Sequence, residues 1–288
     1  MNNRILVTGA TGNVGSEVMS LLHEQGHQVR AAVRSHTGSS HSLLNDVETV
    51  KFDFKQPQTF EPAFVGINTL FLVRPPAISQ VKKYIYPAID AAQAAGVERV
   101  VFLSLLGAEH NPIVPHARIE AYIQSIGLPY TFLRPSFFMQ NLSTIHREDI
   151  RDNNDIFIPA GKGKTSFIDV RDIAATAVKV MTELGHENKA YSLTGDQALD
   201  YYQVAEIFTT VLGRQIVYTN PSIFKFAYQM YKRGLGVDFI AVMMGIYTTV
   251  RLGLAAKVTA DVAQLLQKAP ISMEEFVRDY QENWLTKD

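Results

Sequence analysis

The amino-acid sequence predicts an α/β fold, with a doubly wound parallel sheet and a smaller, mostly helical C-terminal part. Three observations support this fold class. Through the first half of the 288 residues, short β-branched runs alternate with helical stretches, as they do in βαβ units. A glycine-rich turn follows the first run, and strand-like runs become sparse after about residue 135.

We predict strands at residues 5–8, 29–33, 47–52, 69–73, 99–103 and 130–133. These runs are apolar almost throughout, which is typical of parallel strands covered by helices on both faces. Between the first two runs, Val14, Val18, Leu21 and Leu22 recur at helical spacing and form one apolar face. An alanine-rich helix is predicted over residues 78–95, and it ends at Gly96, a common residue at a helix C-terminus.

Capping signals mark the helices of the second half. One helix is predicted over residues 169–183, and Asp200-x-x-Gln203 and Ser272-x-x-Glu275 both indicate capping boxes. The pair Asn220-Pro221 predicts an N-cap followed by a proline at the first helical position. Two short strands are expected at residues 191–193 and 215–218.

We expect two parts along the chain, without a linker between them. The first is a core of residues 1–150, onto which the 165–195 segment packs back. The second is the smaller helical part, residues 151–288.

Composition excludes several classes of protein. The 27 basic and 28 acidic residues nearly cancel, so no nucleic-acid partner is expected. The chain has no cysteine, which excludes disulfides and thiolate metal sites and fits a reducing compartment such as the cytoplasm. The eight histidines lack metal-ligand spacing, so no metal is expected. The longest apolar run, residues 239–247, is far shorter than the roughly 20 residues of a membrane span, and no membrane association or secretory signal is expected.

The most informative motif lies between the first strand and the first helix, where Gly9, Gly12 and Gly15 occur. In a dinucleotide-binding fold the first glycine allows a tight turn, the second lets backbone approach a pyrophosphate, and the third lets the helix pack on the strand. Backbone N–H groups at the helix start then hold the phosphates. The alternative is a plain strand-to-helix turn. We therefore predict a Rossmann-type core that binds a dinucleotide through Gly9, Thr11, Gly12, Asn13, Val14 and Gly15.

The spacing Gly-x-x-Gly-x-x-Gly resembles that of short-chain dehydrogenases/reductases, above all their extended and atypical branches. Arg34 ends the second strand, where this family discriminates between cofactors. A guanidinium there suits a 2′-phosphate, and Ser35 could assist it, so NADP(H) is favoured over NAD(H). The alternative is a solvated charge at the strand end. Asp53 and Phe54 lie where relatives contact adenine, although by themselves they indicate an ordinary turn or helix cap.

Further motifs narrow this resemblance. They are Ala88-Ile89-Asp90-Ala91-Ala92, Ser104-Leu105-Leu106-Gly107-Ala108, Asn141 and the runs 95–102, 127–135 and 167–174. Together they are similar to those of the NmrA-like atypical short-chain dehydrogenases/reductases. That family includes quinone-reductase-like and triphenylmethane-reductase-like enzymes, and also redox sensors that bind NADP without turnover. The resemblance covers most of the chain and is weakest towards its C-terminus.

The usual catalytic pair of short-chain dehydrogenases, which lies on the helix after the fifth strand, is expected to be missing from the whole chain. Those enzymes use Tyr-x-x-x-Lys, in which the lysine lowers the pKa of the tyrosine. Here that helix begins near His116, and Tyr122 is followed by Ile126 at the lysine position. We therefore expect no alcohol or sugar oxidation by this dyad, whereas a quinone can accept hydride and take its proton from water. His116 is the candidate catalytic donor, because imidazole titrates near neutrality, and it could pair with Glu120; alternatively the two only position the helix.

The ends of the fourth to sixth strands supply the other candidates. Leu72 and Arg74 are expected near the nicotinamide ribose, and Arg74 either contacts a phosphate or substrate oxygen or is a solvated loop charge. Ser104 lies where the family's serine is found, and it either faces the nicotinamide or satisfies local backbone groups. Phe137 and Phe138 are candidates for an apolar substrate pocket, or else belong to the core.

These features predict an NADPH-dependent reductase of a quinone-like or other conjugated aromatic small molecule, acting by direct hydride transfer without a Tyr-x-x-x-Lys dyad. The main alternative is a non-catalytic NADP(H)-binding redox sensor that acts through a protein partner. A weaker alternative is an epimerase or dehydratase of nucleotide sugars. The absence of the dyad from its usual helix favours the sensor, and the predicted apolar pocket favours the enzyme. A homodimer is also compatible with the sequence.

Overall fold

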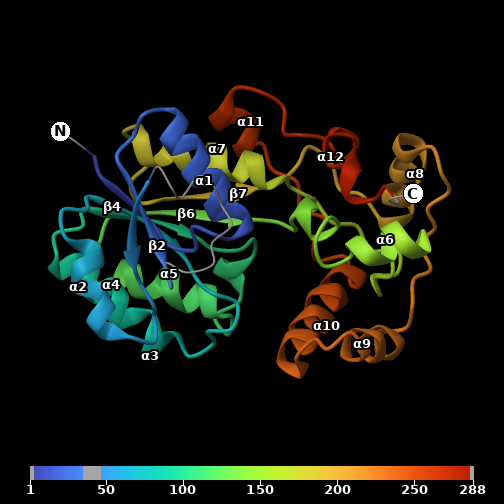
Figure 1. Cartoon of the computed structure of the whole chain (residues 1–288), viewed down its shortest axis with the longest axis horizontal. Coiled ribbons are helices and arrows are strands. Elements are labelled where there is room, and N and C mark those ends of the chain that lie inside the picture. The colour runs from blue at the N-terminus through green and yellow to red at the C-terminus, as the bar shows by residue number, and fades with distance from the viewer. Residues whose placement is uncertain (1–2, 35–46, 286–288) are drawn as a thin grey trace. The chain divides into compact units, whose positions relative to one another are not determined.

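The computed structural model describes residues 3–34 and 47–285 of the chain (Figure 1). The chain forms two compact units. Unit 1 comprises Met1–Pro135 and Val170–Leu193, and unit 2 comprises Ser136–Asp169 and Thr194–Asp288. This division differs from the expected boundary at residue 150. Residues 136–150 belong to unit 2. Residues 170–193 belong to unit 1, because they supply one strand to its sheet and one helix that packs on that sheet.

Unit 1 is built on a seven-stranded sheet in the order β3-β2-β1-β4-β5-β6-β7, with every neighbouring pair parallel (Figure 1). The strands are β1 (Ile5–Val7), β2 (Val29–Val33), β3 (Glu48–Lys51), β4 (Thr69–Val73), β5 (Arg99–Leu103), β6 (Tyr130–Pro135) and β7 (Lys189–Leu193). The predicted doubly wound parallel sheet is therefore confirmed. The strand order reverses between β1 and β4, and in open α/β sheets ligands bind at the carboxyl ends of the strands beside such a reversal.

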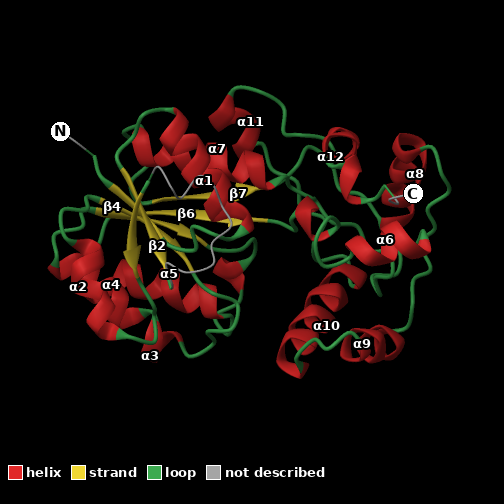
Figure 2. Ribbon diagram, in the orientation of Figure 1, coloured by secondary structure: helices red, strands yellow, loops and turns green. Residues whose placement is uncertain are grey.

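Helices cover both faces of this sheet (Figure 2). On one face α1 (Asn13–Glu24) packs against α7 (Val170–Thr182), and on the other lie α2 (Phe60–Phe64), α3 (Val81–Tyr84), α4 (Tyr86–Ala94) and α5 (Pro115–Ser125). The single helix predicted over residues 78–95 is thus two helices, α3 and α4. Pro87 has no N–H for the bond back to the preceding turn, which interrupts the helix before it.

Unit 2 is helical and has a separate core. Its helices are α6 (Arg147–Asn153), α8 (Tyr201–Leu212), α9 (Ile223–Lys232), α10 (Val237–Arg251), α11 (Asp261–Leu266) and α12 (Met273–Asp279). The largest fully buried side chains of this core are Trp284, Tyr201, Phe167, Phe208, Phe226 and Phe276. Short 3-10 turns complete the two units: η2 (Pro57–Thr59), η3 (Ala108–His110), η4 (Met139–Asn141) and η5 (Gln281–Asn283).

One predicted strand of unit 2 is wrong. The strand expected at 215–218 is only an isolated bridge between Val217 and Asp155. A ladder does not extend there because the N–H of Ile216 donates to Thr209 Oγ1, at 2.9 Å, rather than to a strand partner. The apolar run 239–247 lies within α10, and in the described parts of the chain no helix is both long and apolar enough to cross a membrane.

The N-cap predicted at Asn220 is also misplaced. Ser222 caps α9 instead, since its hydroxyl accepts a hydrogen bond from the N–H of Lys225 at 3.2 Å. The Asn220 side chain accepts from the N–H of Gly161, at 2.9 Å, and its φ is +43°. The amide that could have capped the helix therefore joins two loops of unit 2.

The structure shows the first predicted capping box in full and the N-cap hydrogen bond of the second. Asp200 Oδ1 accepts from the N–H of Gln203 at 2.9 Å, and Gln203 Oε1 accepts from the N–H of Asp200 at 3.1 Å, which is a complete capping box at the start of α8. Ser272 accepts from the N–H of Glu275 at 3.1 Å at the start of α12.

Candidate functional site

The turn from β1 to α1 brings the three predicted glycines together. Gly9 has a φ of +66°, which favours glycine, and a β-carbon built on it would lie 3.1 Å from Cβ of Val73 on β4. A β-carbon on Gly15 would lie 2.0 Å from the carbonyl oxygen of Gly9, so only glycine lets α1 pack this closely on the turn. Gly12 has ordinary extended dihedral angles, φ −88° and ψ 170°. Its own backbone does not require glycine, so the missing side chain at Gly12 leaves space outside the loop.

The N-terminus of α1 carries no side-chain cap in the described parts of the chain. Gly12 is its N-cap and provides no side-chain hydrogen bond, and the first turn carries no acidic residue. The first N–H groups of a helix have no partner within it, so those of Asn13, Val14 and Gly15 lie at the positive end of the helix dipole, an arrangement that suits an anion. Thr11 and Asn13 are exposed, whereas the Val14 side chain is buried and only its backbone faces the loop.

The cofactor-discriminating residues lie at the ends of β2 and β3. Arg34 directly follows β2 and is exposed, and Ser35 lies outside the described residues. The Asp53 carboxylate accepts from the N–H of Lys55 at 2.9 Å and from Gln56 Nε2 at 3.2 Å, so it closes a local turn. The Phe54 ring is 6% exposed and stacks edge-to-face on Phe52 at 4.9 Å. The ring of Phe54 therefore belongs to the core rather than to the surface of this turn.

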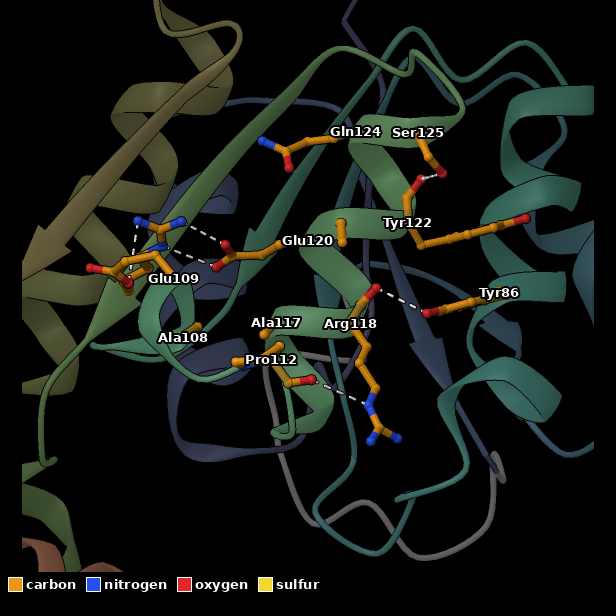
Figure 3. Close-up of a pocket in the computed structure, with 12 residues that line it drawn as sticks. Tyr86, Ala108, Glu109, Pro112, Ala117, Arg118, Glu120, Tyr122, Gln124 and Ser125 are labelled. Atoms are coloured by element: carbon orange, nitrogen blue, oxygen red, sulfur yellow. Dashed lines mark hydrogen bonds and ion pairs between the residues drawn. The ribbon is translucent and has the colours of Figure 1, made fainter.

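A buried carboxylate lies beside the end of β5. Glu120, on α5, accepts from Arg134 Nε at 3.0 Å and Nη2 at 2.6 Å, and also from the hydroxyl of Ser104. Arg134 Nη1 lies 3.4 Å from a Glu109 oxygen as well (Figure 3). The hydrogen bond to Glu120 raises the pKa of Arg134. Ser104 thus donates to a carboxylate, which is neither of the two roles expected for it.

The expected pairing of His116 with Glu120 is wrong, because Arg134 and Ser104 occupy that carboxylate. His116 is half-buried, and its ring stacks on Phe102 with the centroids 5.9 Å apart. Burial, and secondly the charge of Arg74, lower the pKa of His116 to about 3. The expectation that this imidazole titrates near neutrality is therefore also wrong, and His116 is neutral at physiological pH.

Arg74 and Leu72 lie at the end of β4. Leu72 is 1% exposed, so its side chain is part of the core and only its backbone faces the strand end. Arg74 is half-buried, and its Nη1 donates to the carbonyl oxygens of Pro75, Pro76 and Ile78. Arg74 is therefore not the freely solvated loop charge that was one of its two predicted roles.

The two phenylalanines after β6 differ in their surroundings within unit 2. Phe137 packs on the core, with ring centroids 5.9 Å from Phe167 and 5.9 Å from Tyr247. Backbone hydrogen bonds of 2.9 Å join this segment to Ile168 on both sides of Phe138. Phe137 and Phe138 are both half-buried, and of the two only Phe137 stacks on other rings among the described residues.

The expectation that Tyr-x-x-x-Lys is missing from the whole chain is wrong, because the spacing occurs once, at Tyr228 and Lys232, on α9 in unit 2 rather than on α5. Both side chains are exposed, and the Lys232 ammonium lies 4.8 Å from the centre of the Tyr228 ring. On α5 the hydroxyl of Tyr122 donates to Asp90, and this hydrogen bond is the main cause that raises the pKa of Tyr122 to about 12. Ile126 stands four residues after Tyr122, so α5 lacks the Tyr-x-x-x-Lys pair of short-chain dehydrogenases.

A groove of about 700 Å³ runs along the outer face of α5 (Figure 3). Its walls include the stacked rings of Tyr86 and Tyr122, whose centroids are 3.7 Å apart. None of its lining residues belongs to the glycine turn, so the groove is not the predicted cofactor site. In the described residues no cluster of three or more histidines and carboxylates is arranged to hold a metal ion.

Sequence reasoning missed the role of Arg134. The signal was present, since Arg134 is the only charged residue of β6 and lies between Leu133 and Pro135. A charge at such a position needs a partner, and that partner, Glu120, lies on the helix packed against the strand.

Known proteins are similar to this chain along nearly its whole length. The NmrA-like family matches residues 1–277. The NAD(P)H azoreductase of Xenophilus azovorans is 33% identical over 278 residues, which cover 95% of this chain and 96% of the relative. Two solved structures are 27% identical and cover 96% of this chain and 99% of theirs. They are the NADPH-dependent quinone oxidoreductase of Escherichia coli with NADPH, at a TM-score of 0.85, and the triphenylmethane reductase of Citrobacter sp. with NADP(H), at 0.84. The chain therefore belongs to the NmrA-like family.

Proposed function

We propose that the protein is an NAD(P)H-dependent reductase that prefers NADPH and reduces a quinone-like or other conjugated aromatic small molecule. The observation that carries the proposal is the uncapped N-terminus of α1 behind Gly12, where neither a side chain nor an acid occupies the place of a pyrophosphate. The azoreductase, quinone oxidoreductase and triphenylmethane reductase to which the chain is similar support the same class of activity.

The residues of unit 1 fit the cofactor. The N–H groups of Asn13, Val14 and Gly15 would hold its phosphates, and the exposed Arg34 guanidinium would bind the 2′-phosphate of NADP(H). Bound NADPH would supply the hydride, and the protein would supply binding, orientation and exclusion of water. We assign unit 1 to the cofactor and unit 2, through Phe138, to the substrate.

Proton delivery in this reductase does not depend on a strong enzyme acid. Tyr122 holds its proton with a pKa of about 12, and His116 is neutral with a pKa of about 3. A neutral imidazole still offers one N–H to an oxygen of the acceptor, and water completes the protonation of a reduced quinone. His116 is thus proposed as a hydrogen-bond donor to the substrate. Because Glu120 binds Ser104, Glu120 is a positioning residue for the Ser104 hydroxyl.

A second candidate function is a non-catalytic NADP(H) sensor that acts through a protein partner. The same observation about acids favours it, since α5 provides neither a lysine-activated tyrosine nor a protonated histidine. Epimerase and dehydratase chemistry needs such a pair on α5, and we do not propose it.

The experiment that separates these functions measures NADPH consumption with a panel of 1,4-benzoquinone, an azo dye and a triphenylmethane dye. The reductase should oxidise NADPH with at least one acceptor and show no activity on simple secondary alcohols. His116→Ala should lower the rate by less than the roughly 100-fold expected for loss of a true general acid. Tight NADPH binding without consumption by any acceptor would favour the sensor instead.

Phe138 gives a second readout of the same proposal. Phe138→Ala should change the relative rates on the quinone and the two dyes more than it changes NADPH affinity. The matched control is Phe137→Ala, which removes a ring packed on Phe167 and Tyr247 and should mainly lower stability. A uniform effect of both variants on NADPH affinity would contradict the assignment of unit 2 to the substrate.

A further inference from the structure

Arg74 is a half-buried cation that its own loop holds in place. Its Nη1 donates to the carbonyl oxygens of Pro75, Pro76 and Ile78 at 2.9, 3.1 and 2.8 Å. These three bonds fix the guanidinium plane against the segment that follows β4. Among the described residues no carboxylate pairs with Arg74, and burial is the cause that lowers its pKa. The positive charge is therefore positioned but not neutralised.

The opposite edge of the same guanidinium is free. Nε is buried and has no hydrogen-bond partner in the described parts of the chain, and no bond there engages Nη2 either. The Nε–Nη2 edge of arginine presents two parallel N–H groups, the geometry that binds carboxylate, sulfonate or phosphate oxygens. A buried donor left without a partner is costly, which indicates that a ligand satisfies it.

His116 supplies a second unused polar group. Its Nδ1 is buried and likewise lacks a partner among the described residues. His116 stacks on Phe102 of β5, the strand paired with β4, and the charge of Arg74 acts on its imidazole. Because that imidazole is neutral, it offers a hydrogen-bonding group without repelling the cation.

The location of this pair relates it to the cofactor turn. Arg74 directly follows Val73, and Val73 Cβ is 3.1 Å from the place of a β-carbon on Gly9. Arg74 therefore follows the carboxyl end of β4 at the β1–β4 reversal of unit 1, where α/β sheets bind ligands.

We propose that Arg74 and His116 form a binding subsite for an anionic oxygen group of a bound ligand. The oxygens belong either to a carboxylate or sulfonate substituent of the aromatic substrate or to a phosphate of the dinucleotide. This subsite rests on the proposed function, because that function determines which ligands the protein binds. The subsite also refines the proposed function. It gives the reductase a preference for ligands with a negatively charged oxygen group.

The test measures binding, so it does not require turnover. Isothermal titration calorimetry gives the affinity for NADPH, and for naphthalene-2-sulfonate added to protein saturated with NADP⁺. The proteins are the wild type, Arg74→Gln and the matched control Arg118→Gln, which removes an exposed arginine of α5. Arg74→Gln should weaken at least one ligand by about tenfold or more, and Arg118→Gln should weaken neither.

Each outcome has one meaning. A loss of NADPH affinity assigns the subsite to a cofactor phosphate. A loss for the sulfonate alone assigns it to a substrate substituent. Unchanged affinity for both ligands overturns the proposal. Because the sulfonate cannot be reduced, a protein that consumes no NADPH would contradict the proposed function and still leave these affinities readable.

A measurement on the wild-type protein covers the case in which Arg74→Gln does not fold. The ¹⁵Nε–¹H signal of Arg74, identified by its loss in Arg74→Lys, should shift on addition of NADPH or of naphthalene-2-sulfonate. A signal that moves with neither ligand overturns the subsite.

Discussion

A β-carbon on Gly15 would lie 2.0 Å from the carbonyl oxygen of Gly9, so α1 can pack on the turn after β1 only because Gly15 has no side chain. For Gly12 the corresponding distance to the same oxygen is 3.3 Å, which a small shift can relieve. The turn therefore contains glycines of two kinds. Gly15 is required by the fold, whereas the packing around Gly12 makes no such strict demand.

The first prediction separates these two kinds of glycine. Gly12→Val should abolish NADPH binding while the protein stays folded, because its side chain fills the space of the pyrophosphate. Gly15→Ala should destabilise the protein by about 3 kcal/mol, the scale of an overpacked core position. Calorimetry with NADPH and urea unfolding measure the two effects. If Gly12→Val still bound NADPH as tightly as the wild type, the phosphates would have to lie elsewhere.

The second prediction concerns cofactor choice at Arg34. NADPH should bind more tightly than NADH, and Arg34→Ala should weaken NADPH by about 1.5–3 kcal/mol, the scale of a charge-assisted hydrogen bond, with little effect on NADH. Arg278→Ala removes an exposed arginine of unit 2 and is the control for net charge. Equal affinity of the wild-type protein for the two cofactors would contradict this role of Arg34.

The third prediction concerns the buried ion pair of Glu120 and Arg134. Glu120→Gln leaves the Arg134 guanidinium without its principal counter-charge and should lower the free energy of unfolding by roughly 3 kcal/mol. The control is Glu274→Gln, which breaks an exposed pair with Arg278 and should cost less than about 0.5 kcal/mol. Urea unfolding compares the two variants. Similar small losses in both would mean that the buried pair contributes no more than a surface pair.

The fourth prediction follows from two buried histidines. Burial is the main cause that lowers the pKa of both His116 and His146 to about 3, from an ordinary value near 6.5. Between these values the unfolded chain binds more protons than the folded protein, so stability falls as the pH decreases from about 6.5 towards 3. Urea unfolding at about pH 7 and about pH 5 measures the fall. His116→Gln should reduce it, and the exposed His23→Gln should not.

That comparison also has a clear negative outcome. If the loss of stability between the two pH values were the same in the wild type and in His116→Gln, the His116 ring would take up its proton in the folded protein. It could then act as the protonated acid first expected from the sequence.

The sheet could be predicted from the sequence because its signals are local. Each apolar β-branched run is followed by a glycine or a polar turn, and the strands at 29–33, 69–73 and 99–103 have the predicted bounds. The glycine turn has the same local character, since backbone dihedral angles and close packing act within a few residues. Asp200 and Gln203 cap α8 for the same reason.

The partners of the polar side chains could not be predicted in this way. The i, i+4 spacing of His116 and Glu120 suggests a pair, but the carboxylate binds Arg134 from the neighbouring strand. Phe54 follows a strand end, where ligands bind, yet its ring enters the aromatic core with Phe52. In both places the side chain makes a contact other than the one that its sequence position suggests. Sequence spacing contains no information about such a contact.

The central claim, hydride transfer from NADPH to a conjugated acceptor, is tested most directly by a single-turnover experiment. The protein is mixed with NADPH that carries deuterium at one or the other C4 position, and then with an accepted quinone. The account predicts that NADPH oxidation slows for one of the two labelled forms, because the transferred hydrogen is then deuterium. NADPH that binds tightly but is oxidised by no quinone, azo dye or triphenylmethane dye would contradict the account.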